Sequence, residues 1–600
     1  MFFGNNKYAD RVAQMREMMA SRGWDAVVVG ASDPHASEYI APHWQQVRWL
    51  TGFSSEAADV VITASHAGLW TDSRYFIQAE KELSGTGVEL HKTRMPDSVN
   101  IPEWLAAQGI RSVAVDGTCQ TVDFVESLRA ALGNAALIED CPDFISELWS
   151  DRPKIPFEPI VTQDVESFGG VPRREKIGWL REWMEVHNID TMLLSSLDEI
   201  AWLLNVRGSD IEYNPLVISY LTVSRGEVAW YVMKDFEDDI PADTADSFYE
   251  LEQDGVKIDY YSNIDYAFSA PGRIFVDPAT LNYHIYSLLG ACDIISGTSP
   301  IILQKAIKCE TEIASLRQTF VEDGAAVESF IYWLENELNS GREVNEWQAS
   351  LKLTELRSKI PGYRGNSFEN ISAYGANAAL PHYSTPKSGS AQLSRRGLYL
   401  SDSGGQYLTG TTDITRTVPM GKCSGLEMED YTLVLKGMID LAMAIFPEGT
   451  AGCQIDALAR APLWQAKRNF GHGTGHGIGF WLCVHEGPQS IRQNFNPQPL
   501  MPGMVTSDEP ALYREGKHGI RHENIILCVE KGSSEFGRWL GFETLTCCHI
   551  DTSAIVPELL GEAEVEWLND YNDKVYNKLK PYLAPVVRDW LYLKTRPITL

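Results

Sequence analysis

Two short strands and a glycine turn are encoded in the stretch Leu398-Tyr-Leu-Ser-Asp402-Ser-Gly-Gly-Gln-Tyr-Leu-Thr-Gly-Thr-Thr-Asp413-Ile-Thr-Arg-Thr-Val418. β-Branched residues alternate with polar ones along it, a pattern that is typical of antiparallel strands. Asp402 and Asp413 lie eleven residues apart across a glycine-containing turn. We therefore expect the neighbouring strands of a hairpin to bring these two carboxylates together.

A second pair of carboxylates follows in Thr506-Ser-Asp-Glu509-Pro-Ala-Leu-Tyr513 and Gly519-Ile-Arg-His-Glu523-Asn-Ile-Ile-Leu527. Gly516 and Gly519 lie between the two glutamates and are expected to make the turn of a second hairpin, which would close over the first pair. A lone glutamate is usually a surface charge. Glu523, however, leads into an apolar strand, where a buried carboxylate is costly without a cation.

Between the two pairs lies a glycine-rich loop, Gly471-His-Gly-Thr-Gly-His-Gly-Ile-Gly479, which is followed by Val484-His-Glu-Gly-Pro488. The loop and its continuation contain three histidines, and dense glycine lets the backbone approach a ligand closely. A phosphate-binding loop is the competing interpretation, but the Lys-Ser/Thr ending and the dinucleotide spacing are both missing. The HExxH spacing of zinc peptidases is missing as well.

These segments supply five candidate metal ligands: Asp402, Asp413, His476, Glu509 and Glu523. Four carboxylates and one imidazole suit hard or borderline divalent ions such as Mn²⁺, Co²⁺ or Zn²⁺. Two such ions roughly 3.5–4 Å apart can share and deprotonate one water molecule. The residues themselves therefore predict a two-metal hydrolase.

Composition limits the other function classes. The 600 residues suggest three or four domains at about 150 residues each. A formal net charge of −30 argues against a broad surface for nucleic acid or anionic membrane. No apolar run approaches the ~18–20 residues of a membrane span, and Met1 to Asp10 lacks a signal-peptide pattern. Ten scattered cysteines without CxxC pairs indicate reduced thiols and a cytoplasmic protein.

The N-terminal half contains two similar segments, Met15-Arg-Glu-Met-Met-Ala-Ser-Arg-Gly-Trp-Asp-Ala-Val-Val-Val29 and Leu180-Arg-Glu-Trp-Met-Glu-Val-His-Asn-Ile-Asp-Thr-Met-Leu-Leu194. Each has the pattern of helix, turn and buried strand. The similarity continues in Val47-Arg-Trp-Leu-Thr-Gly-Phe53 and Ile200-Ala-Trp-Leu-Leu-Asn-Val206, which favours duplicated α/β domains over chance likeness of two amphipathic helices.

The domain boundaries follow from breaks in these patterns. A proline-rich linker, residues 150–159, separates the two repeats, and a strongly helical segment, 312–339, opens the next unit. We expect domains at residues 1–155, 156–308 and 309–600. The Trp- and Tyr-rich segment 565–593 has helical spacing and is expected to serve in packing or in a subunit contact.

The ordered ligand set, with Asp402-Ser-Gly, Asp413-Ile-Thr-Arg416, His472-Gly-Thr-Gly-His476-Gly and Asp508-Glu-Pro, resembles the pita-bread metallopeptidases. Within that group the chain is similar to the three-domain cytosolic Xaa-Pro aminopeptidases, known as aminopeptidase P. The resemblance extends to Ser37-Glu-Tyr-Ile-Ala41, Trp70-Thr-Asp-Ser-Arg-Tyr-Phe76 and Asp198-Glu-Ile-Ala-Trp-Leu-Leu-Asn-Val-Arg-Gly208. It implies two tandem creatinase-like α/β domains, then a pita-bread catalytic domain with a C-terminal helical extension.

The resemblance also implies an activity. Such enzymes remove the N-terminal residue from peptides whose second residue is proline, using two ions, usually Mn²⁺. Asp402 would bind one ion, Asp413 and Glu523 would bridge both, and His476 with Glu509 would complete the second. A bridging hydroxide would attack the carbonyl before proline, and Glu509 would transfer the proton to the prolyl nitrogen.

Five residues match substrate positions of the family: His382, His472, His485, Tyr513 and Arg521. The three histidines are implied to hydrogen-bond the substrate and to assist proton transfer, while Arg521 and Tyr513 would position it. The chain departs from the family pattern at Ala511-Leu512, at His522 and in Thr544-Leu-Thr-Cys-Cys-His549, and none of these changes removes a ligand. Strand alternation should point His522 away from Glu523, so it is not counted as a ligand.

Other activities occur on the same catalytic fold. Prolidases cut only dipeptides, methionine aminopeptidases lack the two N-terminal repeats, and creatinase and metal-free binding proteins do not need all five ligands. Prolidase, or a peptide-binding scaffold that keeps its metals, is the alternative to aminopeptidase P. The resemblance further implies a homodimer.

Overall fold

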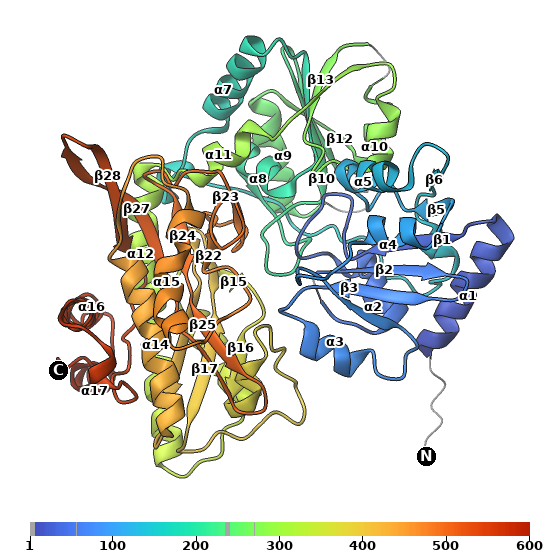
Figure 1. The fold of residues 1–600 in the computed structure, drawn as a ribbon. Helices are drawn as coiled ribbons and strands as arrows, with labels where there is room; N and C mark the ends of the chain where they lie inside the picture. Colours follow the sequence, from blue (N-terminus) through green and yellow to red (C-terminus); the bar gives the residue numbers. More distant parts are fainter. Residues whose placement is uncertain (1–6, 56, 234–239, 269–270, 600) are drawn as a thin grey trace. The chain divides into compact units, whose positions relative to one another are not determined.

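The computed structural model describes residues 7–55, 57–233, 240–268 and 271–599. The expectation about a signal peptide concerns a segment whose first six residues lie outside these ranges. Two compact units are present (Figure 1). One comprises Met1–Gln163 and Pro172–Ile301, and the other comprises Asp164–Val171 and Ile302–Leu600.

The first unit begins with a six-stranded mixed sheet in the order β4-β3-β2-β1-β5-β6. Strand β1 is antiparallel to β2 and parallel to β5. The strands are β1 Ala26–Gly30, β2 Ala58–Thr63, β3 Ala67–Thr71, β4 Glu89–Lys92, β5 Ser112–Val115 and β6 Leu137–Asp140. The helices are α1 Lys7–Arg22, η1 Pro42–Trp44, α2 Gln46–Thr51, α3 Phe76–Glu82, α4 Ile101–Ala107, α5 Val122–Leu132 and η2 Phe144–Glu147.

The second sheet of this unit repeats the first, in the order β12-β11-β10-β8-β13-β14 and with the same succession of parallel and antiparallel pairs. Its strands are β8 Thr191–Leu194, β10 Ser219–Ser224, β11 Val228–Val232, β12 Val256–Tyr260, β13 Arg273–Val276 and β14 Asp293–Ser296, and a small pair is formed by β7 Val161–Thr162 and β9 Val206–Arg207. The helices are α7 Arg173–Val186, α8 Leu197–Leu204, α9 Ala242–Gln253, η3 Tyr261–Tyr266, α10 Tyr283–Leu288 and α11 Pro300–Ala306, the last of which spans the division between the units.

Equivalent residues make the same local structure in both repeats. Gly23 and Asn188 each adopt a positive φ, +73° and +54°, at the turn between helix and strand. The next acidic residue in each repeat, Asp25 and Asp190, accepts a backbone hydrogen bond at the start of a neighbouring strand, β5 and β13 respectively. The predicted duplication is therefore confirmed at the level of topology and of individual hydrogen bonds.

The second unit carries long helices packed against antiparallel strands (Figure 1). Its helices are α6 Val165–Phe168, α12 Glu310–Asn339, α13 Glu346–Arg357, η4 Gly375–Ala379, α14 Gly425–Ala442, α15 Gly452–Gln465, η5 Pro557–Leu559, α16 Glu562–Leu579 and α17 Pro585–Lys594. Helix α12 begins where the Glu312 carboxylate accepts a hydrogen bond from the Cys309 amide at 2.8 Å. The predicted helix 312–339 is thus present, and it begins slightly earlier than predicted, at Glu310.

Four sheets form the β structure of this unit, in the orders β21-β28-β27-β24-β22-β23, β16-β17-β20, β15-β18-β19 and β25-β26. The strands before the glycine-rich loop are β15 Tyr363–Asn366, β16 Ile371–Tyr374, β17 Leu398–Ser403, β18 Gly405–Tyr407, β19 Gly410–Thr411, β20 Ile414–Pro419 and β21 Ile445–Pro447. The later strands are β22 Gly475–Gly477, β23 Glu486–Ile491, β24 Val505–Asp508, β25 Ala511–Arg514, β26 His518–Arg521, β27 Asn524–Ser534 and β28 Gly537–Thr544.

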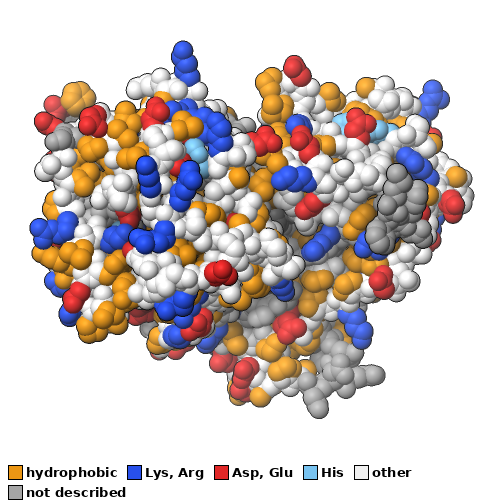
Figure 2. Space-filling view, turned by 90° about the horizontal axis from the view of Figure 1, so that it is seen from below, with side chains coloured by type: hydrophobic (Ala, Val, Ile, Leu, Met, Phe, Trp, Pro, Cys, Tyr) orange, Lys and Arg blue, Asp and Glu red, His pale blue; other side chains and the backbone are white. Residues whose placement is uncertain are grey.

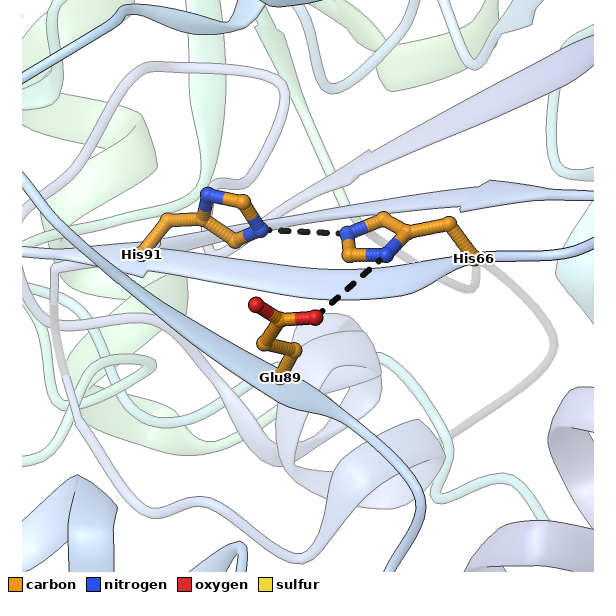
Figure 3. Close-up of side chains that lie close together, drawn as sticks. All are labelled: His66, Glu89 and His91. Atoms are coloured by element: carbon orange, nitrogen blue, oxygen red, sulfur yellow. Dashed lines mark hydrogen bonds and ion pairs between the residues drawn. The ribbon is translucent and has the colours of Figure 1, made fainter.

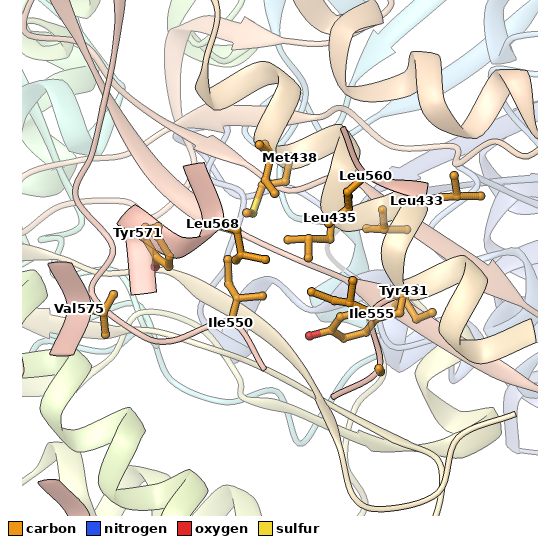
Figure 4. Packing of buried hydrophobic residues seen from close by; sticks show 14 of the residues in the cluster. Tyr431, Leu433, Leu435, Met438, Ile550, Ile555, Leu560, Leu568, Tyr571 and Val575 are labelled. Carbon is orange, nitrogen blue, oxygen red and sulfur yellow. The ribbon is translucent and has the colours of Figure 1, made fainter. Parts of the chain in front are cut away.

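The C-terminal helices belong to the core of the second unit. Leu568 and Val575 of α16 are buried in one cluster with Leu435 and Met438 of α14 (Figure 4). Leu591 of α17 is buried in the same cluster. The segment that was expected to serve in packing therefore does so. The domain limits at 155/156 and 308/309 stay predictions.

Candidate active site

The first pair of carboxylates lies where two strands meet. Strands β17 and β20 are antiparallel, with Asp402 opposite Thr415, and Asp413 directly precedes β20. The chain between them forms a smaller hairpin, β18–β19, which leaves this sheet and pairs with β15. The predicted neighbouring strands are confirmed, and the turn that joins them is a nested hairpin.

The second pair repeats this arrangement. Strands β24 and β27 are antiparallel, with Asp508 opposite Asn524, so Glu509 and Glu523 flank the nested hairpin β25–β26. Gly516 makes the turn of that hairpin at φ +69°. Gly519 does not: it lies within β26, where a Cβ would come 1.7 Å from the carbonyl oxygen of Ala378. Its role is close backbone approach, and the prediction that it makes the turn was wrong.

His476 on β22 faces the carboxylates with one ring nitrogen. Its Nδ1 lies 3.0 Å from the Gly477 carbonyl oxygen and must donate a hydrogen bond to it, so in the neutral ring Nε2 carries the lone pair. That Nε2 lies 3.6 Å from Asp413 Oδ2 and 3.4 Å from Glu509 Oε1. Ser507 Oγ accepts from the His476 amide and donates to Glu509. A histidine held through its far nitrogen in this way is typical of a metal ligand.

The electrostatics of the cluster favour a cation. Ligand atoms of Asp413, His476 and Glu523 lie within 4.8 Å of one another. Burial, reinforced by the neighbouring carboxylates, raises the pKa of Asp413 and of Glu523 well above the usual range, and raises the pKa of Glu509 to about 7. Among the described residues, no hydrogen-bond partner reaches the buried Oδ1 of Asp402. Divalent ions would satisfy that oxygen and hold the carboxylates ionised, so the donor set fits two hard or borderline ions.

A chain of hydrogen bonds connects the cluster to the glycine-rich loop. The Arg521 guanidinium donates to Asp402, to Thr415 Oγ1 at 3.1 Å and to the Tyr513 hydroxyl at 2.5 Å. His472 Nδ1 lies 2.7 Å from the Gly473 carbonyl, so the neutral ring keeps its proton there. The Tyr513 hydroxyl consequently donates a hydrogen bond to His472 Nε2 at 2.8 Å. Three of the predicted substrate residues are therefore connected in the structure.

The two remaining histidines, His485 and His382, differ in their relation to the cluster. The His485 ring meets the His476 ring edge-on, with centroids 4.4 Å apart, and its positive charge when protonated lowers the pKa of Glu509. His382 follows η4, which packs against β26, the strand that ends at Arg521. The structure thus brings His485 against a predicted ligand and puts His382 on the segment after η4.

A buried ion pair shapes the glycine-rich loop. Arg460 of α15 pairs with Asp456 at 2.7 Å and donates to the carbonyls of Phe470 and His472. Asp456 accepts in turn from Thr474 Oγ1 at 2.6 Å. Both charges are satisfied within the protein, so the loop that carries His472 and His476 is held at its base.

Comparisons with known proteins agree with this geometry. The description "Metallopeptidase family M24" matches residues 314–530, and "C-terminal region of peptidase_M24" matches residues 538–598. "Creatinase/Prolidase N-terminal domain" matches twice, at residues 11–148 and 151–312.

The similarity to individual proteins covers nearly the whole chain. A probable Xaa-Pro aminopeptidase P from Paracoccidioides brasiliensis is 38% identical over 98% of this chain and 99% of its own. A probable Xaa-Pro aminopeptidase P from Aspergillus fumigatus is also 38% identical, over 98% of this chain and 92% of its own. The crystal structure of X-prolyl aminopeptidase from Caenorhabditis elegans, described as a cytosolic enzyme with a di-nuclear active site, superimposes with a TM-score of 0.93 at 34% identity, covering 98% of this chain and all of the other.

The chain belongs to metallopeptidase family M24. Family M24 membership makes it a hydrolase, and it confirms the predicted fold class of two creatinase-like domains followed by a pita-bread catalytic domain with a C-terminal extension. Across residues 7–599 with their three gaps, no helix is long and apolar enough to cross a membrane.

Sequence reasoning missed one residue that supports the cluster of carboxylates from behind. Arg416, fully buried, donates to the Glu523 carbonyl at 2.5 Å, to Asn524 Oδ1 at 2.9 Å and to the Tyr571 hydroxyl of α16 at 2.8 Å. Its place three residues after Asp413 was the available signal, but its partners come from distant segments. His522, as strand alternation predicts, turns to the other side and packs edge-on against Tyr431 at 4.4 Å.

Proposed function

We propose that this M24 hydrolase is an Xaa-Pro aminopeptidase, which releases the N-terminal residue from peptides whose second residue is proline. The observation that carries the proposal is the cluster of four carboxylates and one imidazole at the roots of two nested hairpins. Full-length similarity to proteins named Xaa-Pro aminopeptidase P and X-prolyl aminopeptidase supports it.

The proposed ligands are Asp402, Asp413, His476, Glu509 and Glu523. Asp413 and Glu523 would help to hold both ions, because ligand atoms of these two residues and of His476 lie within 4.8 Å of one another. Burial, and then the neighbouring carboxylates, raises the pKa of both acids well above the usual range. Mn²⁺ is the proposed metal, since a carboxylate-rich set with one imidazole prefers a hard ion. When bound, the ions would polarise the scissile carbonyl and lower the pKa of an attacking water molecule.

Glu509 is proposed to move the proton. Its Oε1 lies 3.4 Å from His476 Nε2 and accepts a hydrogen bond from Ser507 at 3.2 Å, so one carboxylate oxygen is fixed in place. The carboxylate would take a proton from the attacking water and give it to the prolyl nitrogen, which leaves as an amine. Protonating that nitrogen matters because it must leave as a neutral amine rather than as an amide anion.

Substrate contacts are proposed for His382, His472, His485, Arg521 and Tyr513. The proton of His472 is held on Nδ1 by the Gly473 carbonyl, and Nε2 accepts from the Tyr513 hydroxyl, so a substrate donor would take the place of that hydroxyl. Tyr513 and Arg521 fix that tautomer from behind. The pair His476–His485 would place a second imidazole beside the metal ligands for the leaving nitrogen.

The test is a comparison of three peptides. Metal-stripped protein reloaded with Mn²⁺ is incubated with Arg-Pro-Pro, Gly-Pro and Met-Ala-Ser, and released amino acids are quantified. We expect free Arg from the first peptide, little action on the other two, and no activity before reloading. Glu509→Gln should lose about 10²–10⁴-fold in kcat, the usual contribution of a proton-transfer group.

Glu530→Gln is the matched control, because Glu530 is an exposed glutamate on β27 in an ion pair with Arg538. It should leave all three activities unchanged. A preference for Gly-Pro would make the protein a prolidase. Silence on every peptide with two ions bound would make it a peptide-binding scaffold.

We also propose a cytoplasmic location and a homodimer. All ten cysteines lie in described segments and are free thiols, which suits a reducing compartment. Charged side chains of both signs are interspersed on the face in Figure 2, consistent with peptides rather than nucleic acid or membrane as partners. Cell fractionation and light scattering of the purified protein would test the two points separately.

A further inference from the structure

A second group of metal-ligand residues lies at the edge of the first sheet. His66 occupies the turn between β2 and β3, and Glu89 and His91 lie on the edge strand β4 (Figure 3). Glu89 and His91 are two residues apart, so their side chains project from the same face of β4. Strand pairing sets Gly68 opposite Glu89 and Trp70 opposite His91.

The donor atoms are close enough for one ion. His66 Nε2 and His91 Nε2 are 3.0 Å apart, and one ligand atom from each of the three residues lies within 4.8 Å of the others. Glu89 Oε2 now lies 3.7 Å from His66 Nδ1, the ring nitrogen that would not bind the ion. With metal–nitrogen bonds of about 2.0–2.1 Å, two nitrogens bound at a right angle lie about 2.9 Å apart, and tetrahedral ones about 3.3 Å. The observed separation falls in this interval. Glu89 is largely exposed, so its carboxylate can move to complete the set.

The backbone beneath the imidazoles is shaped for them. A Cβ at Gly68 would come 2.6 Å from His66 Nε2 and 2.9 Å from His91 Cδ2. Trp70 stacks on the His91 ring with centroids 3.9 Å apart and planes 8° from parallel. Trp104 lies against the His66 ring at 4.8 Å. Glycine and two tryptophans therefore hold the pair of rings in one place over bare backbone.

The two rings are available as ligands at neutral pH. Burial lowers the pKa of His66 and of His91, and the charge of His66 lowers the pKa of His91 further. The Glu89 carboxylate raises the pKa of both rings, and the charge of Arg16 lowers the pKa of His66. In the neutral pair the Nε2–H of one ring donates a hydrogen bond to the Nε2 of the other. A bound ion would replace the hydrogen that lies between the two nitrogens.

We propose that His66, Glu89 and His91 form a binding site for a borderline divalent transition-metal ion such as Zn²⁺, Ni²⁺ or Cu²⁺. Two imidazoles and one carboxylate prefer such ions, whereas the carboxylate-rich cluster of the second unit suits Mn²⁺. The ion would join the β2–β3 turn to the edge strand β4, which is otherwise held from one side only. Its remaining coordination positions would be filled by water.

The test titrates the full-length protein with Cu²⁺, the divalent ion that such sites bind most tightly. Because Cu²⁺ would also displace Mn²⁺ from the carboxylate cluster, whose proposed ligand set has one imidazole, the two-nitrogen species alone reports on the new site. Electron paramagnetic resonance counts the nitrogen ligands, and calorimetry gives the stoichiometry. We expect one Cu²⁺ with two-nitrogen hyperfine structure that is lost in His66→Asn/His91→Asn. The matched control, His43→Asn/His187→Asn, changes two histidines elsewhere in the first unit and should retain it.

Two further variants separate ligand loss from misfolding. Gly68→Ala keeps all three donors and fills the space beneath the rings, so it should weaken Cu²⁺ binding at least ~10-fold, which 1.4 kcal/mol of lost affinity would produce. Glu89→Gln should weaken it less and leave the two-nitrogen signal. The proposal is overturned if the His66→Asn/His91→Asn protein binds Cu²⁺ with the stoichiometry and spectrum of the unmodified chain.

Discussion

Tyr513 lies between Arg521, which donates to the proposed ligand Asp402, and His472, because it accepts from Arg521 and donates to His472. Tyr513→Phe removes both hydrogen bonds and leaves His472 Nε2 without the hydroxyl that holds the ring in place. We expect kcat/KM on Arg-Pro-Pro to fall about 3- to 10-fold, the equivalent of about 0.5–1.5 kcal/mol for a hydrogen bond. Metal content, measured by mass spectrometry, should not change.

The matched control for that experiment is Tyr592→Phe, in which a partly exposed tyrosine of α17 loses its hydroxyl. An unchanged kcat/KM in Tyr513→Phe, or a fall that the control shares, would contradict the role assigned to the hydrogen-bond chain. A loss of bound metal would place Tyr513 among the groups that maintain the ligand cluster instead.

The carboxylates of the cluster also predict a dependence of stability on metal. Asp413 and Glu523 are buried close to the half-buried Glu509, so without cations the three carboxylates repel one another or bind protons. Removing the metal should lower Tm, and Mn²⁺ at about 100 times its Kd should restore about 2.7 kcal/mol per site. Differential scanning calorimetry with and without Mn²⁺ measures this. In Asp413→Asn the shift should shrink, and an equal shift there would refute the assignment.

At the scale of elements, both hairpins were predictable because glycine turns and alternating residues are local signals. The nested hairpins β18–β19 and β25–β26 could not be predicted. Strands β25 and β26 pair only with each other, and β18–β19 pairs with β15, so neither hairpin continues the sheet of the strands that flank it. Gly519 illustrates the limit: its neighbour in space is Ala378, and no local pattern announces a backbone contact over that distance. The contacts of Arg416 and His66 could not be predicted for the same reason, because their partners lie in other segments of the chain.

The C-terminal helices supply an element-scale prediction. Leu568 of α16 is fully buried against the cluster that includes Met438 and Leu435 of α14. Leu568→Ala should lower the free energy of unfolding by about 2–5 kcal/mol, through lost burial and the cavity left behind. Urea denaturation followed by circular dichroism gives the value.

Val586→Ala on α17 is the control, since that side chain is 60% exposed and should cost less than about 0.5 kcal/mol. If Leu568→Ala behaved like Val586→Ala, α16 would be an accessory contact rather than part of the catalytic core. The expected loss of stability would instead show that α16 is part of this core. The same helix contacts the Arg416 guanidinium through the Tyr571 hydroxyl.

For the molecule as a whole, an ion pair connects the two repeats of the first unit. His284 of α10 lies 3.1 Å from Asp140 at the end of β6, and this hydrogen bond raises the pKa of His284 above its ordinary 6.5. The stabilisation is fully present below about pH 6.5 and is lost as pH rises through the raised pKa. The side chain is partly exposed, so we expect about 0.2–1 kcal/mol.

Urea denaturation at pH 6 and pH 8.5 measures this contribution as a difference. His284→Asn should be less stable than the unmodified chain at pH 6 and equal to it at pH 8.5. His187→Asn, which removes an exposed histidine hydrogen-bonded to the Trp183 carbonyl, corrects for general effects of pH. A stability gap for His284→Asn that did not narrow with rising pH would exclude the ion pair as its cause.

The nested hairpins have a consequence for synthesis on the ribosome. Asp402 and Glu523 are separated by roughly 6 to 24 s of translation at ~5–20 residues per second, and Tyr571 emerges later still. The strands of the first unit pair mostly with near neighbours and can assemble in the meantime. A nascent chain stalled before Tyr571 should therefore carry folded N-terminal sheets and no bound metal. The growing polypeptide would acquire its hydrolytic capacity only after the segment that encloses Arg416 has left the exit tunnel.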